Sequence, residues 1–334
     1  MKISIPKKLK IASALVSVAI VTMVALFGAC ADLNFYPSAE RLSSTSITQT
    51  DVLPKTTGIL KIHFIDVGQG DSIFLELPNG KTMLIDAGDT SSGVKIVNYI
   101  KALGYDKIDY LVATHPHEDH IGGMPYVLSS LNVGEVWAPK VIHTTRTYEN
   151  FLDAVEESGL SIRTAEKGKT IVADEKLTVE VLSPIAASYS DLNNWSAVLF
   201  LSFDKTTYLF TGDANKNVIL LAYNAHVDVL KVGHHGSYTS TDAALVSALT
   251  PTYSVISCGI GNSYGHPTEE ALQALESSNV YRTDLQGTIV AESNGVDIIF
   301  SVSAVTYVVP KTLAQENNLE NDTLISSAQS TPPA

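Results

Sequence analysis

The sequence predicts an α+β fold in which two β-sheets pack face to face and helices cover their outer faces. The first half of the chain begins with short alternating segments and continues with strand and helix patterns in alternation, and the second half repeats that order. Of the 334 residues, 45% are hydrophobic, which suffices for one large core. One domain of roughly 200–250 residues with flanking segments fits this length better than two domains. Two sheets with outer helices would bury all the apolar faces.

The elements expected in the first half follow from local patterns. Pro78-Asn79-Gly80 supplies a turn between two alternating segments, and a short apolar run ends just before residue 115, as a buried strand would. Apolar residues also recur twice at helical spacing. The expected strands are 60–67, 72–77, 82–86, 108–114 and 132–139, and the expected helices are 93–103 and 146–158.

The second half shows the same kinds of pattern. Alternating segments return after residue 175, and two helical patterns separate the later strands. The expected strands are 176–182, 197–203, 206–211, 227–232 and 253–257, with two more within 287–302, and the expected helices are 242–249 and 269–276.

The first thirty residues have the pattern of an export signal. Lys7, Lys8 and Lys10 precede an apolar run over 11–27, and Gly28-Ala29-Cys30 follows. Small residues directly before a cysteine resemble the lipobox of bacterial lipoproteins, in which the cysteine thiol takes a lipid. The run is short for a spanning helix, but an uncleaved anchor and a secreted protein with a cleaved signal remain alternatives. We expect a lipoprotein on the extracellular face of the cell membrane, lipidated at Cys30.

The rest of the chain divides by composition. Residues 31–57 are rich in Ser, Thr, Asn and Pro and predict a flexible tether. Residues 58–303 hold the predicted catalytic domain. Residues 304–334 predict the end of a strand and a disordered polar tail. No obligate protein partner is expected.

Charge and cysteine content restrict the function further. Loss of residues 1–29 would remove four lysines, leaving 18 basic and 35 acidic residues, a net charge of 18 − 35 = −17. A surface with this much negative charge does not attract polyanions over a long range. Cys258 would then be the only free thiol, so no disulfide is expected within the chain.

The strongest chemical signal is a histidine-rich segment directly after a predicted buried strand. Three histidines and an acid within six residues can converge on one point there, and imidazole and carboxylate are ligands that zinc prefers. Ile121-Gly122-Gly123 follows and would let a helix start close against the loop. The segment is His115-Pro116-His117-Glu118-Asp119-His120.

This segment resembles the signature of the metallo-β-lactamase superfamily, and three further segments agree with it. The resemblance implies an αββα sandwich of two mixed sheets holding two divalent metal ions. It implies that Asp86 orients a metal-bound histidine from behind and that Asp213, in a Thr-Gly-Asp turn, bridges both ions. In the segment Gly-His-His-Gly, either His234 or His235 is implied as the last ligand, and the other as a substrate contact.

Five motifs in register narrow the resemblance to the extracellular β-lactamase-like domain of the ComEC/Rec2 competence proteins. The resemblance covers about residues 60–302 and does not extend to the membrane channel of those proteins. The motifs are Val67-Gly68-Gln69-Gly70-Asp71, Asn193-Asn194-Trp195-Ser196, His234-His235-Gly236-Ser237, Gly261-Asn262-Ser263-Tyr264-Gly265-His266-Pro267, and Arg282-Thr283-Asp284 with Gly287.

One departure from the superfamily pattern affects the expected ligands. Many members have a further histidine before the bridging acid, and here the interval offers only His143, whose position fits poorly. Asn194 or Ser196 would then lie near an open or water-filled position of the first site, which leaves the metal open between zinc and manganese. The first site is expected to contain His115, His117 and Asp213, and the second Asp119, His120, Asp213 and His234 or His235.

These residues indicate a metal-dependent hydrolase, because two ions bridged by an acid activate water at neutral pH. Three catalytic residues are expected. Asp119 would bind metal and also steer the nucleophile, and the others are His266 and whichever of His234 and His235 is not a ligand. His266 would contact a phosphate or leaving group, although it could instead be an ordinary residue at the start of a helix.

The competence resemblance favours a phosphodiesterase acting on extracellular DNA, including single-stranded DNA. The acidic charge opposes a tight grip on long DNA, but Lys140, Arg146 and Lys231 could form a local basic rim. The alternatives are a hydrolase of small cell-envelope phosphodiesters, similar to surface phosphorylcholine esterases, and a non-catalytic binding module. The competence-type motifs disfavour a β-lactam hydrolase.

Overall fold

A computed structural model of the chain describes residues 58–305. The predicted export signal (1–30), the tether (31–57) and nearly all of the predicted tail lie outside the described residues. Within 58–305, no helix combines the length and the apolar character needed to cross a membrane.

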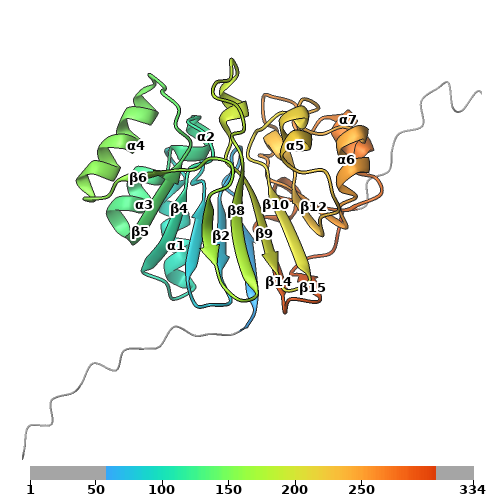
Figure 1. Cartoon of the computed structure of the whole chain (residues 1–334), viewed down its shortest axis with the longest axis horizontal. Coiled ribbons are helices and arrows are strands. Elements are labelled where there is room, and N and C mark those ends of the chain that lie inside the picture. The colour runs from blue at the N-terminus through green and yellow to red at the C-terminus, as the bar shows by residue number, and fades with distance from the viewer. Residues whose placement is uncertain (1–57, 306–334) are drawn as a thin grey trace, which may run out of the picture. The chain divides into compact units, whose positions relative to one another are not determined.

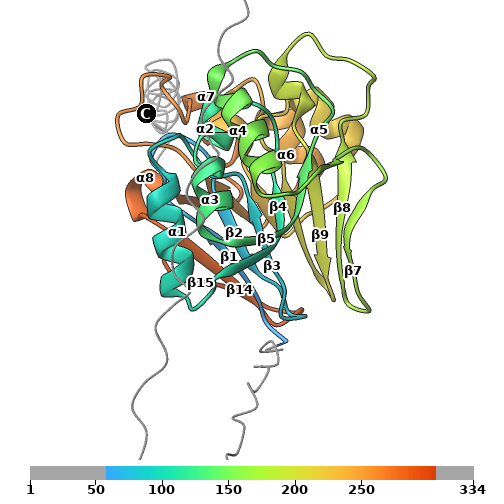
Figure 2. The same cartoon turned by 90° about the vertical axis from the view of Figure 1, so that its left-hand side faces the viewer.

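Four layers make up the described residues, with two sheets in the middle and helices on both outer faces (Figures 1 and 2). Each sheet mixes parallel and antiparallel pairs; for example, β3 pairs antiparallel with β2 and parallel with β4. This arrangement confirms the expected sandwich of two mixed sheets.

The first sheet has eight strands in the order β15-β14-β1-β2-β3-β4-β5-β6. Its strands β1 to β3 form the expected antiparallel start, and the last two strands of the described residues, β14 and β15, extend it beyond β1. The strands are β1 (Leu60–Phe64), β2 (Ile73–Glu76), β3 (Thr82–Ile85), β4 (Lys107–Val112), β5 (Asn132–Ala138), β6 (Ile162–Thr164), β14 (Ile289–Ser293) and β15 (Ile298–Phe300).

The second sheet has seven strands in the order β13-β12-β11-β10-β9-β8-β7. Its strands β10 to β13 run parallel, while β7 to β9 form antiparallel pairs. The strands are β7 (Thr170–Ala173), β8 (Leu177–Ser183), β9 (Val198–Phe203), β10 (Thr206–Phe210), β11 (Val229–Lys231), β12 (Tyr253–Ile256) and β13 (Asn279–Arg282).

The helices lie outside the sheets. Helices α1 to α4 cover the first sheet and α5 to α7 the second (Figure 1). Asp242 and Thr268 cap α6 and α7 through side-chain oxygens that accept backbone N–H groups. The helices are α1 (Gly93–Ala102), α2 (Glu118–Ile121), α3 (Met124–Ser130), α4 (Arg146–Glu157), α5 (Lys216–Ala222), α6 (Ala243–Leu249), α7 (Glu269–Ala274) and α8 (Thr283–Gln286), with 3₁₀ turns η1 (Leu192–Trp195) and η2 (Gly233–Gly236).

Three apolar clusters fill the spaces between the layers. The central cluster lies between the sheets and joins residues of both, such as Phe64 and Tyr208. A second cluster packs α1, α3 and α4 on the first sheet, and a third packs α5, α6 and α7 on the second. Because both faces of each sheet are covered, central strands such as β3 are buried along their whole length.

Some short elements were not expected from the sequence, such as α5 with seven residues and β6 with three. Others of similar length, α6 and α7 with seven and six residues, were expected. Helices α1 and α4, with 10 and 12 residues, were expected nearly to the residue, because a longer helix repeats its apolar period more often. The sequence also showed no sign of α2, α8, β7 and β13.

Glycines allow the histidine-rich loop to pack tightly, as the sequence predicted. A Cβ atom added to Gly123 would lie 2.2 Å from the carbonyl oxygen of Ala87, and one added to Gly70 would lie 2.4 Å from that of Asp119. The Ala87 amide donates to the His120 carbonyl at 2.7 Å. The loop therefore lies directly against the turn after β3.

A buried ion pair links the two sheets. Lys231, in β11, has 1% of its surface exposed, and its Nζ donates to Asp71 Oδ2 at 2.8 Å and to the Val232 carbonyl. Asp71 belongs to the turn between β1 and β2. Burial alone would raise the pKa of Asp71, but the Lys231 ammonium, followed by His235, lowers it to about 2. Both charges are thus kept in the interior.

We predict that Lys231→Ala lowers the free energy of unfolding by about 3–5 kcal/mol, because it leaves the Asp71 carboxylate buried without its cation. Chemical denaturation measures this loss. The pKa of Asp71 is depressed from 3.8 to about 2. The loss of unfolding free energy in the variant should therefore be largest above pH 4 and become smaller toward pH 2. Lys205→Ala, at an exposed turn, is the control and should change stability by less than about 0.5 kcal/mol. Equal effects of the two variants would contradict a stabilising pair.

Cys258 should be chemically inert in the folded protein. Burial, followed by the charge of Asp284, raises the pKa of its thiol to about 12, and the side chain is fully buried. In a Cys30→Ser variant at pH 8, we expect a thiol reagent to label the native protein negligibly and the unfolded protein at once. Fast labelling of the native protein would mean that the third apolar cluster opens readily.

Candidate metal centre

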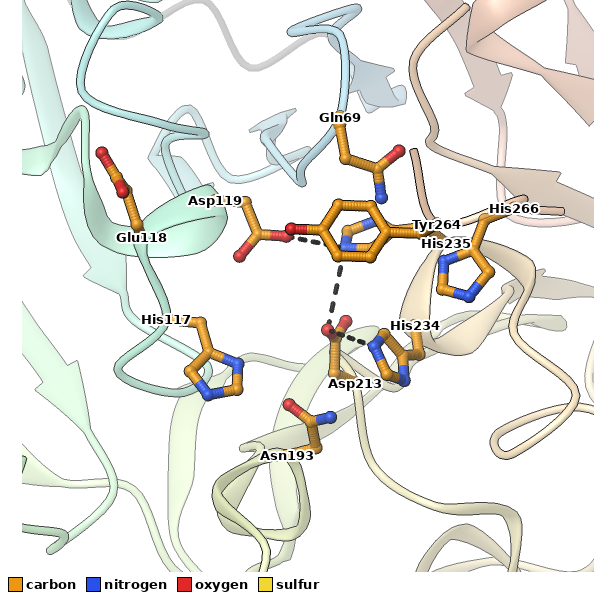
Figure 3. Close-up of a pocket in the computed structure, with 10 residues that line it drawn as sticks. All are labelled: Gln69, His117, Glu118, Asp119, Asn193, Asp213, His234, His235, Tyr264 and His266. Atoms are coloured by element: carbon orange, nitrogen blue, oxygen red, sulfur yellow. Dashed lines mark hydrogen bonds and ion pairs between the residues drawn. The ribbon is translucent and has the colours of Figure 1, made fainter. Parts of the chain in front are cut away.

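Metal-ligand side chains from both sheets meet at one edge of the sandwich. His115, His117, Asp119 and His120 follow β4 of the first sheet. Asp213 follows β10 and His235 lies in η2 after β11, both in the second sheet. Figure 3 shows His117 and His234 on opposite sides of Asp213. The expected ligands are therefore brought together from segments that lie far apart in the sequence, between residues 115 and 235.

The side chains form two groups that share Asp213. One contains Asp119, His120, Asp213 and His235, and the other contains His115, His117 and Asp213. Within each group, the potential ligand atoms lie within 4.8 Å of one another. The division matches the two expected sites.

These residues fit divalent metal ions. His120 Nε2 and Asp213 Oδ1 are buried and have no hydrogen-bond partner in the structure, although buried polar atoms are normally paired. Neutral imidazole with carboxylate is a ligand set for zinc and also suits manganese. Both of these unpaired atoms belong to the group with four ligands, so this group is the better suited of the two to bind an ion.

The carboxylates give the centre a strong negative field. Burial raises the pKa of Asp213, but the positive charges of His120 and His235 outweigh burial and hold that pKa well below its usual range. Burial lowers the pKa of His120, and the carboxylates of Asp213, Asp119 and Asp86 reverse this and raise it well above its usual range. The electrostatics of the centre therefore favour positive charge beside Asp213.

Asp86 supports His120 from behind, where the resemblance placed it. Its Oδ2 lies 2.8 Å from His120 Nδ1 and accepts the Thr114 hydroxyl at 2.7 Å, while Oδ1 accepts the Thr114 amide at 2.8 Å. Asp86 is fully buried. These contacts fix the His120 ring and direct Nε2 toward Asp213.

Ser196 lies beside the first ligand group, as expected, whereas Asn194 contacts a backbone amide. Ser196 Oγ accepts the Asp213 amide at 3.0 Å and lies 3.5 Å from His115 Nδ1, so it positions two ligands. Asn194 Oδ1 accepts the Asn215 amide at 3.0 Å. The neighbouring Asn193, instead of Asn194, lines the cavity at the metal centre. The asparagine at the cavity is therefore Asn193, one residue before the expected Asn194.

The structure separates the roles of His234 and His235. His235 is buried, its Nε2 lies 3.1 Å from Asp119 Oδ2, and its Nδ1 lies 3.0 Å from the Ser257 carbonyl. The His234 side chain is 27% exposed and belongs to neither ligand group, although its Nε2, like that of His235, lies 3.7 Å from Asp213 Oδ2. Both residues adopt the left-handed region, with φ of 50° and 55°. This strained turn directs the two neighbouring rings to different places.

His266 faces the cavity, as expected of a substrate contact. The cavity has a volume of about 360 Å³ and opens beside Asp119 and Asp213. The His266 ring lies 5.3 Å from the His234 ring, and its buried Nδ1 has no hydrogen-bond partner in the structure. Burial, followed by the charges of His234 and His235, lowers the pKa of His266 to about 4. His266 is therefore neutral at pH 7.

Several residues at the site were missed by the sequence interpretation. Asn262 holds the loop that carries His266, because its Oδ1 accepts the His266 amide at 3.0 Å and its Nδ2 donates to the Gly259 carbonyl. Gln69, Glu118 and Tyr264 line the cavity. All four stand in motifs that the resemblance had marked, but no role had been assigned to them there.

Other residues lie away from the centre. His143 belongs to neither ligand group, although its ring lies 6.3 Å from that of His117. The Arg282 guanidinium is held by Asp284. Lys231 does not belong to a basic rim, because it is buried, and Arg146 pairs with Glu149 on the surface. Of the three proposed cations, only Lys140 lies exposed without an acidic partner among residues 58–305.

Comparisons with known proteins agree with this geometry. A model of the metallo-beta-lactamase superfamily matches residues 65–260. ComE operon protein 3 of Bacillus subtilis (strain 168) is 34% identical over an alignment of 252 residues, which covers 69% of this chain and 32% of that protein. Competence protein ComA of Neisseria gonorrhoeae is 30% identical over 232 residues, 67% of this chain and 31% of that protein.

The chain spans about a third of the length of these curated relatives. Among solved structures, the metallo-beta-lactamase fold protein YhfI of Bacillus subtilis has a TM-score of 0.49 at 14% identity, covering 70% of this chain and 99% of that one. The family model covers more than half of the chain and includes the histidine-rich segment and Asp213. This chain therefore belongs to the metallo-beta-lactamase superfamily, and its matched region is homologous to part of the ComEC competence proteins.

Proposed function

We propose that this protein is a phosphodiesterase that cleaves extracellular DNA with two divalent metal ions, zinc or manganese. The observation that carries the proposal is the pair of ligand groups sharing Asp213 beside an open cavity. Paired ions about 3.5–4 Å apart are the recurring arrangement in enzymes that cleave phosphodiesters. The homology to proteins named for competence supports DNA as the substrate.

The protein side chains would divide the work around the cavity. Bound metal ions would polarise the phosphoryl group and lower the pKa of water. The Asp119 carboxylate, 33% exposed and 3.1 Å from His235, is placed to take a proton from the attacking water. His234 and His266 line the cavity and can donate hydrogen bonds to the phosphate or the leaving oxygen.

A second candidate is a hydrolase of small cell-envelope phosphodiesters with a cationic head group, such as a phosphorylcholine ester. Glu118 lines the same cavity, and the chain carries a net charge of −13. A carboxylate at the entrance would attract a cation and repel a free polyanion.

One assay separates these candidates. Metal-stripped protein is reloaded with zinc or manganese and given single-stranded DNA, bis(p-nitrophenyl) phosphate and a phosphorylcholine ester. Metal-restored cleavage of DNA supports the first proposal. Hydrolysis of the small esters alone supports the hydrolase of small phosphodiesters. No turnover of any substrate would support a non-catalytic binding module.

Asp213→Ala should abolish metal-dependent activity on bis(p-nitrophenyl) phosphate while the circular dichroism spectrum stays close to that of wild type. The reason is that Asp213 is the only residue common to both ligand groups. The matched control is Asp153→Ala, an exposed position on α4, which should keep full activity. Activity retained by the Asp213→Ala variant would contradict the assignment of two metal ions.

We also propose that the protein is held on the extracellular face of the membrane by a lipid on Cys30. The support is the sequence pattern Gly-Ala-Cys after an apolar run. Cells fed radioactive palmitate should label the wild-type chain and leave the Cys30→Ser variant unlabelled. Equal labelling of both chains, or of neither, would contradict lipidation at Cys30.

A further inference from the structure

A second cavity, of about 370 Å³, shares the turn η1 with the cavity at the metal centre and has no part in the roles assigned so far. Lys140 from the loop after β5, Lys167 from the turn before β7, and Trp195 from η1 line it. Ile185 and Glu166 contribute to the same walls. The cavity therefore combines two cations with an aromatic ring.

The turn η1 connects the two cavities. Asn193 lines the cavity at the metal centre, and Trp195, two residues later, lines the second one. The loop after β5 also reaches both places, since it carries Lys140 and, three residues on, His143, whose ring lies 6.3 Å from His117. A chain-like substrate that leaves the metal centre past Asn193 would enter the second cavity.

The two lysines carry charge that no acid neutralises. Both are exposed, and neither has an ion pair with any residue in the described range. The adjacent Glu166 is occupied by Lys169 at 3.6 Å. In a chain with 35 acidic and 22 basic residues, two free cations on one cavity are an exception that favours a negatively charged ligand.

The aromatic ring is held in a fixed orientation. Trp195 is half-buried, and the Tyr189 ring meets it edge-on with centroids 5.5 Å apart at 78°. The Tyr189 hydroxyl oxygen in turn accepts the backbone amides of Ile185 and Ala186 at 2.9 and 3.0 Å. Because the indole is already fixed, little side-chain entropy is lost when a flat ring stacks on it.

We propose that this second cavity binds single-stranded nucleic acid, with Lys140 and Lys167 contacting phosphates and Trp195 stacking on an unpaired base. Stacking on an aromatic side chain beside a basic groove is the general mode by which proteins bind single strands. Paired bases in a duplex are not free to stack in this way. The inference rests on the proposed phosphodiesterase function, because it assigns the substrate class of the same site.

The kinetic test uses the metal-loaded, full-length protein with a dT12 oligonucleotide and with bis(p-nitrophenyl) phosphate. Lys140→Ala/Lys167→Ala should raise the KM for dT12 about tenfold or more and lower the slope of log KM against log salt by about 1.4, since each single-strand phosphate contact contributes about 0.7. Trp195→Ala should raise the KM for dT12 by a similar factor, and Trp195→Phe should restore most of it. Activity on bis(p-nitrophenyl) phosphate, which is too small to reach the second cavity, should stay unchanged.

Lys205→Ala is the matched control, because Lys205 is exposed, has no ion pair in the described range and lies at the opposite end of β10 from the metal centre. It should leave both substrates unaffected. An equal rise in KM for both substrates in the Trp195 variants would mean that Trp195 merely supports Ser196 and Asp213, and would overturn the stacking role.

A binding measurement keeps the inference testable even if the protein does not cleave DNA. The chain has two tryptophans, and Trp137 is 7% exposed, so fluorescence quenching by an oligonucleotide would report on Trp195. A phosphorothioate dT12, which resists hydrolysis, should quench wild type, bind the double lysine variant at least tenfold more weakly, and not quench Trp195→Phe.

The two proposals can therefore fail separately. Quenching without cleavage would overturn the DNA hydrolysis proposal and support the second cavity. Cleavage of dT12 with no effect of the lysine and tryptophan variants would overturn the second cavity and support the phosphodiesterase. An abasic oligomer that binds as tightly as dT12 would indicate a site for a polyanion without bases, such as an envelope polymer, and would contradict base stacking.

Discussion

The buried ion pair between Lys231 and Asp71 is the contact on which the metal centre depends. It joins a strand of the second sheet to the first turn of the first sheet, and the other oxygen of Asp71 lies 3.4 Å from His235 Nδ1. The same carboxylate thus holds the sheets together and helps to orient a metal ligand. Removing either charge would leave the other in the interior, where an unpaired ion is costly. The position of His235 is therefore set by the packing of the whole sandwich.

The sequence predicted the parts of the site that are local and missed those that depend on tertiary structure. The segment from His115 to His120 is contiguous, so its ligands were visible as a motif. The choice between His234 and His235 depended on two left-handed residues, which no pattern of hydrophobicity reveals. Lys231 was misassigned to the surface because a lysine at the end of a strand gives no sign of a carboxylate 160 positions away. Long elements such as α4 were predicted nearly to the residue, whereas elements of three to seven residues were predicted in some cases and missed in others, as β6 and α5 were.

Net charge and local charge point in different directions in this molecule. The whole chain is acidic, which opposes long-range attraction of nucleic acid. In the second cavity, however, two lysines lack acidic partners in the described range, and the fixed ring of Trp195 lines the same cavity. Such an arrangement relies on short-range contacts rather than long-range attraction, and is suited to strands that are already held nearby. An anchored protein would meet that condition, because its substrate would be delivered at the cell surface.

The ligand groups also have a consequence for how long the protein survives. The ligands after β4 belong to one sheet, and Asp213 and His235 belong to the other, so an ion bound among them is a cross-link between the two layers. A ligand that binds only the folded state stabilises it by mass action, in proportion to the logarithm of its free concentration. The free concentration of the metal ion would then set the resistance of the domain to proteases as well as its turnover rate. Metal starvation would remove the protein itself along with its activity.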